Sequence, residues 1–468
     1  MATTAPDRTA LAELRRDVDG GVLVPGDRSY DEARALFNAM IDKRPAVVVA
    51  CARPEDVARA LRFADEAGLE VSVRGGGHGV AGTALVDGGL VIDLRLMNTV
   101  TVDPVARTAT VGGGATMSHL DRATEPFGLA TTGGRVSTTG VGGFTLGGGT
   151  GWLDRKLGLA CDRLLEVELV RADGAVVTAS ERENPELFWA LHGGGGNFGV
   201  ATRMTFRLDR LPEVTLALLL WPADEGPRVL RRYRDLLEPG PDELGGGFVY
   251  LTGPQESFVP PELVDTLCAV VLVTFAGSRA DAGPSLRPLL ELAPSGQMVE
   301  TMPYAELQCA LDDPPGYRNY WSAEHLSGLP DVAVDAVCAR APEMVVPSPS
   351  QHVVFPAGGR VAREGLEYPI PWRTAPWVVH PFGLWEDPAD DDRARAWARG
   401  VREAVRPWAT GAVYLNFIGD EGSDRVAAGF GEENYARLAA VKAEHDPHNV
   451  FHVNHNIVPA PPRPRGPS

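Results

Sequence analysis

His78 lies in the segment of this sequence best suited to chemistry on a bound molecule. The run Arg74-Gly-Gly-Gly-His78 ends in a histidine, and Gly79 follows it. A neutral imidazole is a good nucleophile near pH 7, and flanking glycines let it come close to a ligand. The same residue types also suit a tight turn whose histidine bonds to nearby backbone. The segment alone leaves both interpretations open.

Glycine gathers in four clusters in the first half of the chain, at 75–77, 112–114, 133–151 and 193–196. Glycine permits positive φ and leaves backbone amides unshielded, so a large anionic cofactor can approach without Lys or Arg beside it. None of the clusters gives G-x-G-x-x-G between a strand and a helix with an acidic residue roughly 20 positions on, which is the pattern of a dinucleotide fold. The G-K-S/T ending of a P-loop is absent as well. The clusters predict a different kind of cofactor site, with tight turns alone as the plainer alternative.

Other side chains could supply acid–base or metal chemistry. The pairs His445/His448 and His452/His455 have an i, i+3 spacing that would allow a shared metal ion. Possible bases come from the middle of the chain, and each also has a packing explanation, because tyrosines in a sheet usually bury the ring and keep the hydroxyl wet. These possible bases are Tyr317, Tyr320, His352 on the expected strand Gln351–Phe355, Tyr368 and Glu386.

The elements that must position these residues begin with a strand–helix–strand unit. Residues 46–73 predict a strand, a helix that opens at Pro54, and a second strand that leads into the first glycine cluster. Strands and short helices continue to about residue 212, with Asp173-Gly174 as a hairpin turn.

The chain changes character after about residue 212, where the dense glycine clusters end. The middle third predicts a large sheet covered by helices, among them Pro227–Leu237 and Pro330–Ala339. From about residue 410, a strand at Ala412–Ile418 precedes a helix at Glu433–Glu444.

In their order and spacing, these motifs resemble the berberine bridge enzyme-like flavoproteins, which have the vanillyl-alcohol-oxidase or PCMH-type FAD fold. The resemblance spans about residues 40–460. Each motif is weak alone, and the combination is specific. The motifs are R-G-G-G-H at 74–78, the glycine block at 136–151, GGGGNFGV at 193–200, Tyr414-x-Asn416, Tyr435-x-x-Leu438-x-x-Val441-Lys442, Asp446-Pro447-x-Asn449-x-Phe451 and Asn454-x-Asn456-Ile457-x-Pro459.

The resemblance implies an α+β fold in which a two-part PCMH-type FAD-binding domain carries an inserted antiparallel-sheet substrate domain flanked by helices. Residues 1–212, with a core from about residue 40, would form the FAD-binding domain together with the C-terminal segment 410–460. Residues 213–409 would form the substrate-binding domain over the flavin. We expect the proline-rich residues 461–468 to be a disordered tail.

In this family the histidine of the R-x-G-G-H segment bonds through a ring nitrogen to the flavin 8α-carbon, and here that residue is His78. Many members add a second bond from a cysteine in C-P-T-V-G-x-G-G. Val136 stands at that position here, and valine cannot form a thioether, so the resemblance implies covalent FAD with a single link. The residues expected at the FAD site are Arg74, Gly75, Gly76, Gly77, His78, Gly79, Val136, Thr139, Gly140, Gly142, Gly143, Gly149, Val200, Tyr414, Asn454 and Asn456.

Flavin oxidation of an alcohol, amine or C–H group also needs a base. Family members often have a tyrosine base at the end of a Y-x-N-Y segment, which reads Tyr414-Leu-Asn416-Phe417 here. Phe417 cannot take a proton. On the expected strand, Tyr414 and Asn416 would share one face. The histidine pairs fall in a C-terminal segment where the family uses no metal, so we expect none. The catalytic candidates are Tyr414, Tyr320 and His352.

The aromatic segment LEYPIPWRTAPWVVHPFGLWED predicts a pocket formed by Trp372, Trp377, Phe382 and Trp385, although packing under helices is an equal alternative. We expect a small aromatic or polycyclic substrate of secondary metabolism, with molecular oxygen as the reoxidant. Two other functions stay open. One is a carbohydrate oxidase of the same family, and the other is a protein with structural FAD that promotes a non-redox cyclisation or binds a ligand.

Composition argues against several partners. Lys and Arg number 44 against 62 Asp and Glu, a net charge of −18, so nucleic acid and anionic membranes are poor partners. The 5 cysteines are far apart and form no CxxC pair. No apolar run is long enough for a transmembrane helix, and the N-terminus lacks the pattern of a signal peptide. We therefore expect a cytoplasmic protein.

Overall fold

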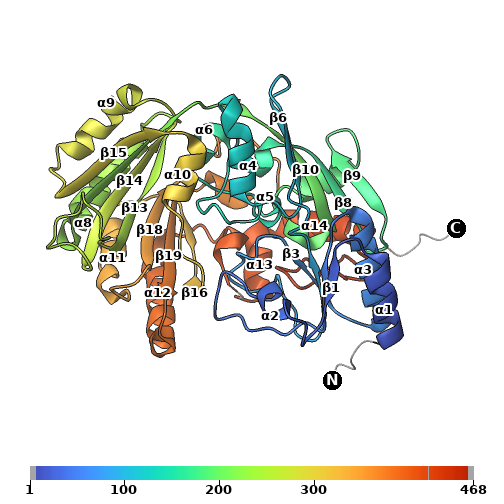
Figure 1. Cartoon of the computed structure of the whole chain (residues 1–468). Coiled ribbons are helices and arrows are strands. Elements are labelled where there is room, and N and C mark those ends of the chain that lie inside the picture. Colours follow the sequence, from blue (N-terminus) through green and yellow to red (C-terminus); the bar gives the residue numbers. More distant parts are fainter. Residues whose placement is uncertain (1–6, 420, 462–468) are drawn as a thin grey trace.

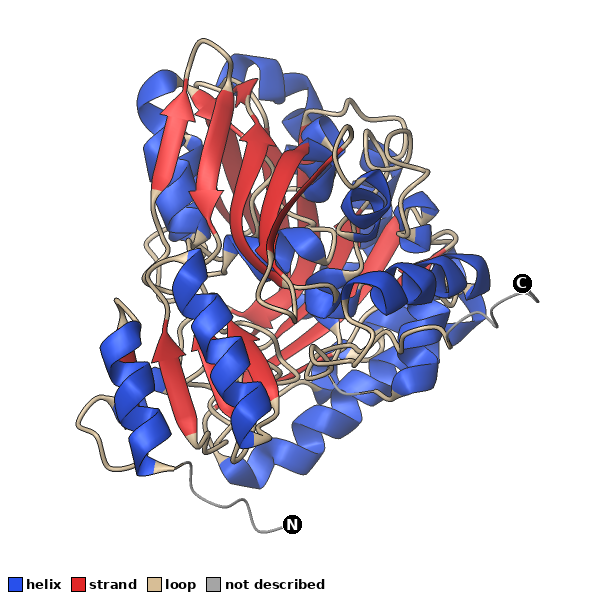
Figure 2. Ribbon diagram, turned by 90° about the vertical axis from the view of Figure 1, so that its right-hand side faces the viewer, coloured by secondary structure: helices blue, strands red, loops and turns tan. Residues whose placement is uncertain are grey.

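The computed structural model describes residues 7–419 and 421–461. Its described residues form two halves (Figure 1). One half contains two small sheets with their helices, and the other is one large sheet with helices on its outer face. Figure 2 views the molecule from the right-hand side of Figure 1, so that the smaller half faces the viewer. The α+β class predicted from the sequence is confirmed.

The N-terminal sheet is a four-stranded sheet in the order β1 (Gly21–Leu23), β2 (Val47–Ala50), β4 (Leu90–Asp93) and β3 (Val71–Arg74). The last three strands are parallel, and α3 (Pro54–Ala67) connects β2 to β3. Gly68 ends this helix in the left-handed conformation, with φ of 63°. The helices α1 (Arg8–Asp17) and α2 (Tyr30–Ala33) precede this unit. The predicted strand–helix–strand unit is confirmed.

The second sheet is antiparallel in the order β5 (Val100–Asp103), β6 (Thr108–Gly112), β10 (Val200–Arg207), β8 (Leu164–Val170) and β9 (Val176–Ser180). Gly174, with φ of 80°, closes the predicted hairpin between β8 and β9. Around this sheet lie α4 (Met117–Thr124), α5 (Val141–Leu146), α6 (Asp154–Leu157) and α7 (Pro185–Ala190). A two-stranded pair joins β7 (Leu129–Ala130) to β11 (Asp209–Arg210).

The large sheet is antiparallel and is built from eight strands. Its order is β15 (Gly296–Met302), β12 (Val214–Pro222), β14 (Leu267–Phe275), β13 (Leu244–Thr252), β18 (Gln351–Pro356), β19 (Trp377–Trp385) and β16 (Arg318–Trp321), and β17 (Glu324–Leu326) also pairs with β19.

Helices cover only one face of this sheet. They are α8 (Gly226–Leu237), α9 (Arg279–Leu290), α11 (Asp331–Cys338) and α12 (Asp391–Val405). The two helices predicted in this stretch, Pro227–Leu237 and Pro330–Ala339, are thereby confirmed. A further helix, α10 (Tyr304–Ala310), packs against α4 and so links the two halves.

Side chains alternate between the two faces of the large sheet. On β12, Ala217, Leu219 and Trp221 pack with the covering helices, whereas Leu216 and Leu218 face the other half of the molecule. This is the period of two that a strand imposes, and both faces are buried. The inner face of the sheet is therefore available to roof a site.

The C-terminal segment returns to the smaller half through α13 (Ser423–Phe430) and α14 (Glu432–His445). The predicted helix at Glu433–Glu444 is confirmed. The predicted strand at Ala412–Ile418 is wrong: residues Leu415–Phe417 form a 3₁₀ turn. Asn416 anchors this turn, because its Nδ2 donates to the carbonyls of Gly143 and Phe144, each at 3.3 Å.

Within the described residues, no helix is both long and apolar enough to cross a membrane. In that same part of the chain, no group of three or more His, Cys, Asp or Glu side chains could hold a metal ion. Of the expected tail at 461–468, residues 462–468 lie outside the described residues.

Candidate active site

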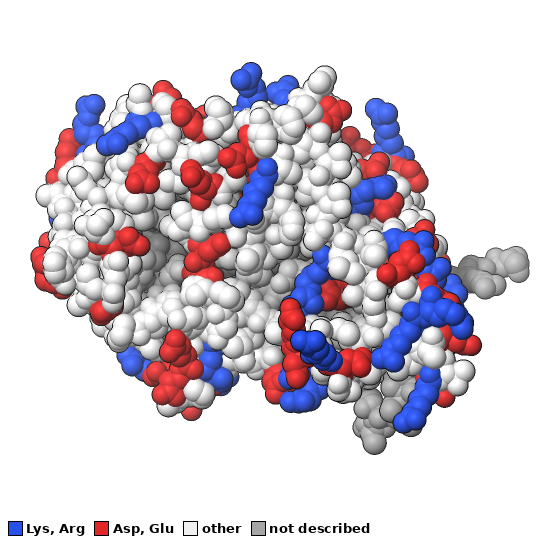
Figure 3. Space-filling model, in the orientation of Figure 1, with Lys and Arg blue, Asp and Glu red and all other residues white. Residues whose placement is uncertain are grey.

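A cavity of about 900 Å³ lies where the two halves meet. Its floor is the backbone of the glycine clusters, its roof is the inner face of the large sheet, and segment 451–455 closes one end. The volume is at the upper end of the roughly 300–1,000 Å³ of ligand pockets. Figure 3 shows acidic and basic side chains interspersed over the outer surface on this side of the molecule.

His78 lies in the cavity wall just after β3. Its ring stacks on Phe37, with ring centroids 4.3 Å apart and 22° between the planes. Its Nε2 lies 2.8 Å from the Thr138 hydroxyl. Burial lowers the pKa of His78 to about 4, so the imidazole is neutral at pH 7. The site thus holds a fixed, neutral imidazole whose Nδ1 has no hydrogen-bond partner among the described residues.

The cavity floor contains glycine backbones packed too closely for side chains. A Cβ on Gly76 would lie 2.3 Å from the Gly140 nitrogen, and one on Gly140 would lie 2.3 Å from the Gly76 nitrogen. Gly143 and Gly195 also line the cavity, and a Cβ on either would meet nothing within 4 Å. The floor therefore offers bare backbone beside open space, which fits a large anionic cofactor lying against it.

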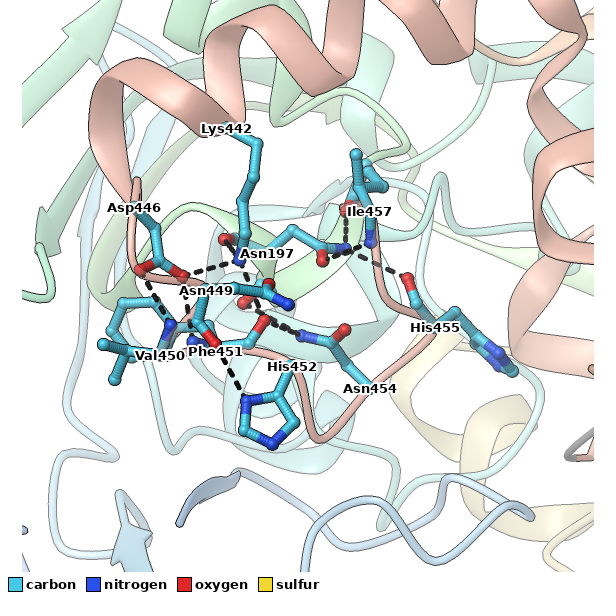
Figure 4. A network of polar contacts seen from close by, with 12 residues as sticks. Asn197, Lys442, Asp446, Asn449, Val450, Phe451, His452, Asn454, His455 and Ile457 are labelled. Atoms are coloured by element: carbon cyan, nitrogen blue, oxygen red, sulfur yellow. Dashed lines mark hydrogen bonds and ion pairs between the residues drawn. The ribbon is translucent and has the colours of Figure 1, made fainter. Parts of the chain in front are cut away.

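A buried ion pair holds the C-terminal segment against the last glycine cluster (Figure 4). Lys442 Nζ lies 2.6 Å from Asp446 Oδ2 and donates to the carbonyls of Asn197 and Phe451, at 2.6 and 2.9 Å. Asp446 in turn accepts the backbone N–H groups of Val450 and Phe451. Lys442 and Asp446 have no exposed side-chain surface. This network fixes the turn that closes the cavity.

Asn454 projects from that turn into the cavity wall. Its Nδ2 donates to the Phe451 carbonyl at 3.0 Å, whereas its buried Oδ1 has no partner among the described residues. A buried polar atom without a partner is rare and costly. A cofactor donor that reached Asn454 would satisfy it.

Most of the residues predicted at the FAD site line this one cavity. They are Gly75, Gly76, Gly77, His78, Gly79, Val136, Thr139, Gly140, Gly142, Gly143, Val200, Tyr414 and Asn454. Arg74, Gly149 and Asn456 do not line it. The Arg74 guanidinium instead donates to the backbone carbonyls of Ala33 and Ala35.

Aromatic side chains form the roof over the glycine floor. Those that line the cavity are Trp152, Trp321, Phe355, His380, Phe382 and Phe417. Of the four aromatic residues predicted for the substrate pocket, only Phe382 is among them. Trp377 and Trp385 have the odd positions of β19 and face the helices, and Trp372 packs beside Tyr414, with ring centroids 5.0 Å apart. The predicted pocket is therefore wrong in three of its four members.

Tyr414 lines the cavity with its hydroxyl already engaged. Its oxygen accepts the backbone N–H of Gly149 at 3.2 Å and the Asn416 amide at 2.9 Å. Burial raises the pKa of Tyr414 to about 12, so its hydroxyl keeps its proton at neutral pH. Tyr414 is therefore positioned to orient groups at the site, not to accept a proton.

The other two catalytic candidates lie outside the cavity wall. His352 is on β18 but on the helix side, with its ring centroid 5.9 Å from that of Trp397, and both ring nitrogens lack partners. Tyr320 is on β16, and its hydroxyl lies 3.4 Å from Arg399 Nε. Tyr317, Tyr368 and Glu386 are likewise absent from the wall. His352 and Tyr320 lie on strands of the large sheet, whereas Tyr317, Tyr368 and Glu386 lie outside its strands.

His380 lines the cavity, although the sequence analysis did not single it out. It lies on β19, its Nδ1 is 2.7 Å from the Ser322 carbonyl, and its ring stacks on Phe417. Burial, with a smaller effect from the charge of Arg135, lowers the pKa of His380 to about 4. The alternation of β19 placed this histidine on the same face as Phe382.

Two further polar side chains reach the cavity. The Arg135 guanidinium lies 3.9 Å from the ring centroid of Phe355 and donates to the carbonyls of Thr150 and Gly151, at 3.2 and 3.3 Å. Asp313 accepts a hydrogen bond from Gln351 at 2.7 Å, and burial raises the pKa of its carboxyl to about 7. The cavity wall thus carries the cation of Arg135 and the weakly acidic carboxyl of Asp313, and Glu256 and Glu300 also line it.

Two sequence-family profiles match the chain at the segments that form this site. A profile described as "FAD binding domain" matches residues 45–180, and one described as "Berberine and berberine like" matches residues 413–458. The first contains His78 and most of the glycine floor, and the second contains the C-terminal segment with Tyr414 and Asn454.

Individual relatives match over nearly the whole chain. The (R)-6-hydroxynicotine oxidase of Paenarthrobacter nicotinovorans is 32% identical, with 94% of this chain and 97% of that protein covered. The crystal structure of 6-hydroxy-D-nicotine oxidase from Arthrobacter nicotinovorans matches with a TM-score of 0.81 at 30% identity, covering 94% and 98%. Physcomitrella patens BBE-like 1 has the same fold, with a TM-score of 0.85 at 23% identity, covering 96% and 99%. The chain therefore belongs to the berberine bridge enzyme-like family of FAD-linked oxidoreductases, with the PCMH-type fold.

Proposed function

We propose that this protein is an oxidase that holds FAD through a single covalent bond from His78 and oxidises a small, largely apolar substrate, with oxygen as the reoxidant. The observation that carries the proposal is His78 itself, a neutral imidazole at the cavity wall with an unpartnered Nδ1. Val136 lies in the same wall and has no atom that could form a second bond.

The described residues suit the parts of FAD in distinct ways. The bare backbone of the glycine clusters would receive the pyrophosphate, because unshielded N–H groups bind anions without a cation. Asn454, with its unpartnered Oδ1, would accept a hydrogen bond from the cofactor. When bound, FAD supplies the hydride acceptor and, through oxygen, the means of reoxidation.

The roof of the cavity supports an aromatic or polycyclic substrate. Trp321, Phe355 and Phe382 line it, so a flat apolar molecule would find rings on which to pack. The names of the nicotine oxidases identify a ring-bearing amine as what those relatives oxidise. A ring-bearing amine or alcohol is therefore our first choice of substrate class for this chain, and an oligosaccharide is the second.

The tether is tested by denaturing the holoenzyme in acid and mapping the yellow peptide by mass spectrometry. We expect the flavin on a fragment that contains residue 78 and on no other. His78→Ala is expected to release its FAD on denaturation. Free FAD from the wild-type protein would reject the tether.

The redox role is tested by anaerobic mixing with a defined panel of probes, followed by air. The panel contains (R)-6-hydroxynicotine, N-methylbenzylamine, benzyl alcohol and xylobiose. We expect an aromatic member to bleach the flavin and hydrogen peroxide to form on admission of air. Bleaching by xylobiose alone would support the carbohydrate alternative. No bleaching by any probe would favour structural FAD with a non-redox role.

A further inference from the structure

His380 presents one edge of its ring to the cavity and the other to its own sheet. It lies on β19 between β18 and the short strand β17, paired with Val353. Its Nδ1 lies 2.7 Å from the backbone carbonyl of Ser322. Its ring is stacked on Phe417, with centroids 4.2 Å apart and 12° between the planes. The ring is thus held on two sides in one orientation.

The contact with Ser322 determines the tautomer of His380. A carbonyl oxygen can only accept, so Nδ1 must carry the proton. Because the imidazole is neutral at pH 7, Nε2 then carries a lone pair. Nε2 has no hydrogen-bond partner among the described residues, and the residue lines the cavity. The site therefore contains a fixed acceptor nitrogen with no protein donor of its own.

The rings packed around His380 offer no other proton acceptor. Phe417 has no titratable group. Tyr414 retains its proton and already accepts two hydrogen bonds. The rings of Tyr414 and Phe417 are in contact, with centroids 4.8 Å apart. Phe417 also stacks on His380, so it separates Tyr414 from His380.

We propose that Nε2 of His380 is the proton acceptor of this active site, in place of the tyrosine that Phe417 replaces. This inference rests on the proposed oxidase function. FAD, when bound, would supply the hydride acceptor for a substrate whose C–H carbon bears an O–H or N–H group: the C–H bond would break and its hydrogen would leave with the electron pair to the flavin, which would be reduced. The O–H or N–H bond breaks and its proton passes to Nε2, and a C=O or C=N bond forms. The imidazolium releases that proton to solvent before the next turnover.

The tautomer can be tested without any substrate. In holoenzyme labelled with ¹⁵N in the histidine rings, long-range ¹H–¹⁵N spectra distinguish protonated from bare ring nitrogens. The His380 signals are those that are lost in His380→Gln. We expect protonated Nδ1 and bare Nε2 at pH 7. A protonated Nε2, alone or together with Nδ1, would overturn the proposal.

The catalytic role is tested by anaerobic flavin bleaching with N-methylbenzylamine or benzyl alcohol, whichever reduces the wild-type enzyme faster, because both carry the N–H or O–H group that the step requires. His380→Phe keeps a ring to stack on Phe417, and His380→Gln keeps polar atoms, but neither has the Nε2 base. We expect both to lower the bleaching rate constant about 100-fold or more. Both should keep wild-type covalent flavin content, since His380 is remote in sequence from His78 and does not form the glycine floor.

The outcomes separate the two proposals. If the wild-type enzyme is bleached and both variants are bleached at its rate, the oxidase function stands and the role of His380 is overturned. If no probe bleaches the wild-type flavin, the oxidase function fails, and the role of His380 in it fails as well. If only one variant loses its flavin, that variant is misfolded. The bleaching rate of the other variant then tests the role of His380.

Discussion

Nε2 of His78 lies 2.8 Å from Oγ1 of Thr138. This contact joins the first glycine cluster, which His78 follows, to the third, which contains Thr138. With the hydroxyl as acceptor of the Nε2 proton, the lone pair of this neutral imidazole is on Nδ1. In that arrangement Thr138 would direct Nδ1 to the flavin 8α-carbon of the proposed covalent bond. In the sequence, the only sign of this role was that Thr138 lies inside the glycine block.

Replacing Thr138 by valine keeps its shape and removes the hydroxyl. We expect Thr138→Val to attach FAD covalently more slowly than wild type, because the Nδ1 lone pair is no longer favoured. The measurement is the fraction of flavin that stays with acid-precipitated protein over time after FAD is added to apoprotein. Thr138→Ser is the matched control and should attach FAD at nearly the wild-type rate. Equal rates for valine and wild type would remove Thr138 from this role.

Two glycines of the cavity floor should respond differently to alanine. A Cβ on Gly76 would lie 2.3 Å from the Gly140 nitrogen, so Gly76→Ala must move backbone and lower the melting temperature of the apoprotein. Gly143 lies in α5, where a Cβ meets nothing and alanine is the better helix former by about 1 kcal/mol. Gly143→Ala should therefore keep or raise that melting temperature.

The same pair separates folding from cofactor binding. The Cβ of Gly143→Ala would occupy space beside the cavity, so we expect it to lower flavin content at saturating FAD although the apoprotein is stable. Absorbance at the flavin band per mole of protein measures this. Full flavin content in Gly143→Ala would show that the cofactor does not approach α5 closely.

The sequence predicted the floor of the site well because its residues are contiguous. Arg74 to Gly79 follows directly from a predicted strand, so the segment that carries His78 also fixes where it lies, and the block at 136–143 is one continuous run. Arg74 is the exception: its guanidinium reaches the carbonyls of Ala33 and Ala35, which no local pattern foretells.

The roof could be predicted only as strands, without knowing which face looks inward. On β18 and β19 the side chains that line the cavity alternate with ones that do not, so His380 and Phe355 face it whereas His352 and Trp377 do not. Both faces are apolar and buried, and a period of two cannot distinguish them. The covering helices determine which face of the sheet looks outward, and these helices come from distant parts of the chain.

The turn at 415–417 is another case where long-range contacts override a local pattern. The alternation in Ala412–Ile418 favoured a strand. Asn416 instead caps carbonyls of α5 that lie far away in the sequence, at Gly143 and Phe144. That bond turns the chain and brings Phe417 into the roof beside His380.

The buried pair Lys442–Asp446 should matter more to stability than any exposed pair. Removing one partner of a buried ion pair leaves an uncompensated charge and costs about 3–5 kcal/mol. Lys442→Met also removes donors to the Asn197 and Phe451 carbonyls. We expect a loss of about that size in urea unfolding, together with lower flavin content, since the turn at Asn454 is held by this network (Figure 4).

Arg15→Met is the control for that experiment. Arg15 forms an ion pair with Asp27 at 3.0 Å, and the two side chains are 44% and 37% exposed. Exposed pairs contribute about 0.2–1 kcal/mol. If both methionine variants lose the same stability, the buried network is not the support of the C-terminal segment.

His352 should make the protein sensitive to acid. Burial lowers its pKa to about 3, against roughly 6.5 in an unfolded chain. The stabilisation from keeping it neutral is complete above about pH 6.5 and is lost as the pH falls toward 3. At pH 5 the loss would be about 2 kcal/mol. His352→Leu should therefore show a smaller fall in melting temperature between pH 7 and pH 5 than wild type; parallel curves would contradict this.

A tyrosine at position 417 should partly replace a missing His380. Phe417 lines the cavity and stacks on His380. A hydroxyl added to its ring would therefore lie in the part of the cavity next to the His380 imidazole. In the double variant His380→Phe, Phe417→Tyr we expect flavin bleaching to recover at least tenfold over His380→Phe. The recovery should increase with pH, because a phenol must ionise before it can accept a proton and its ordinary pKa is about 10. Phe417→Tyr in the wild-type background is the control and should change the rate far less. No recovery in the double variant at any pH would mean that position 417 cannot serve as the base in this protein.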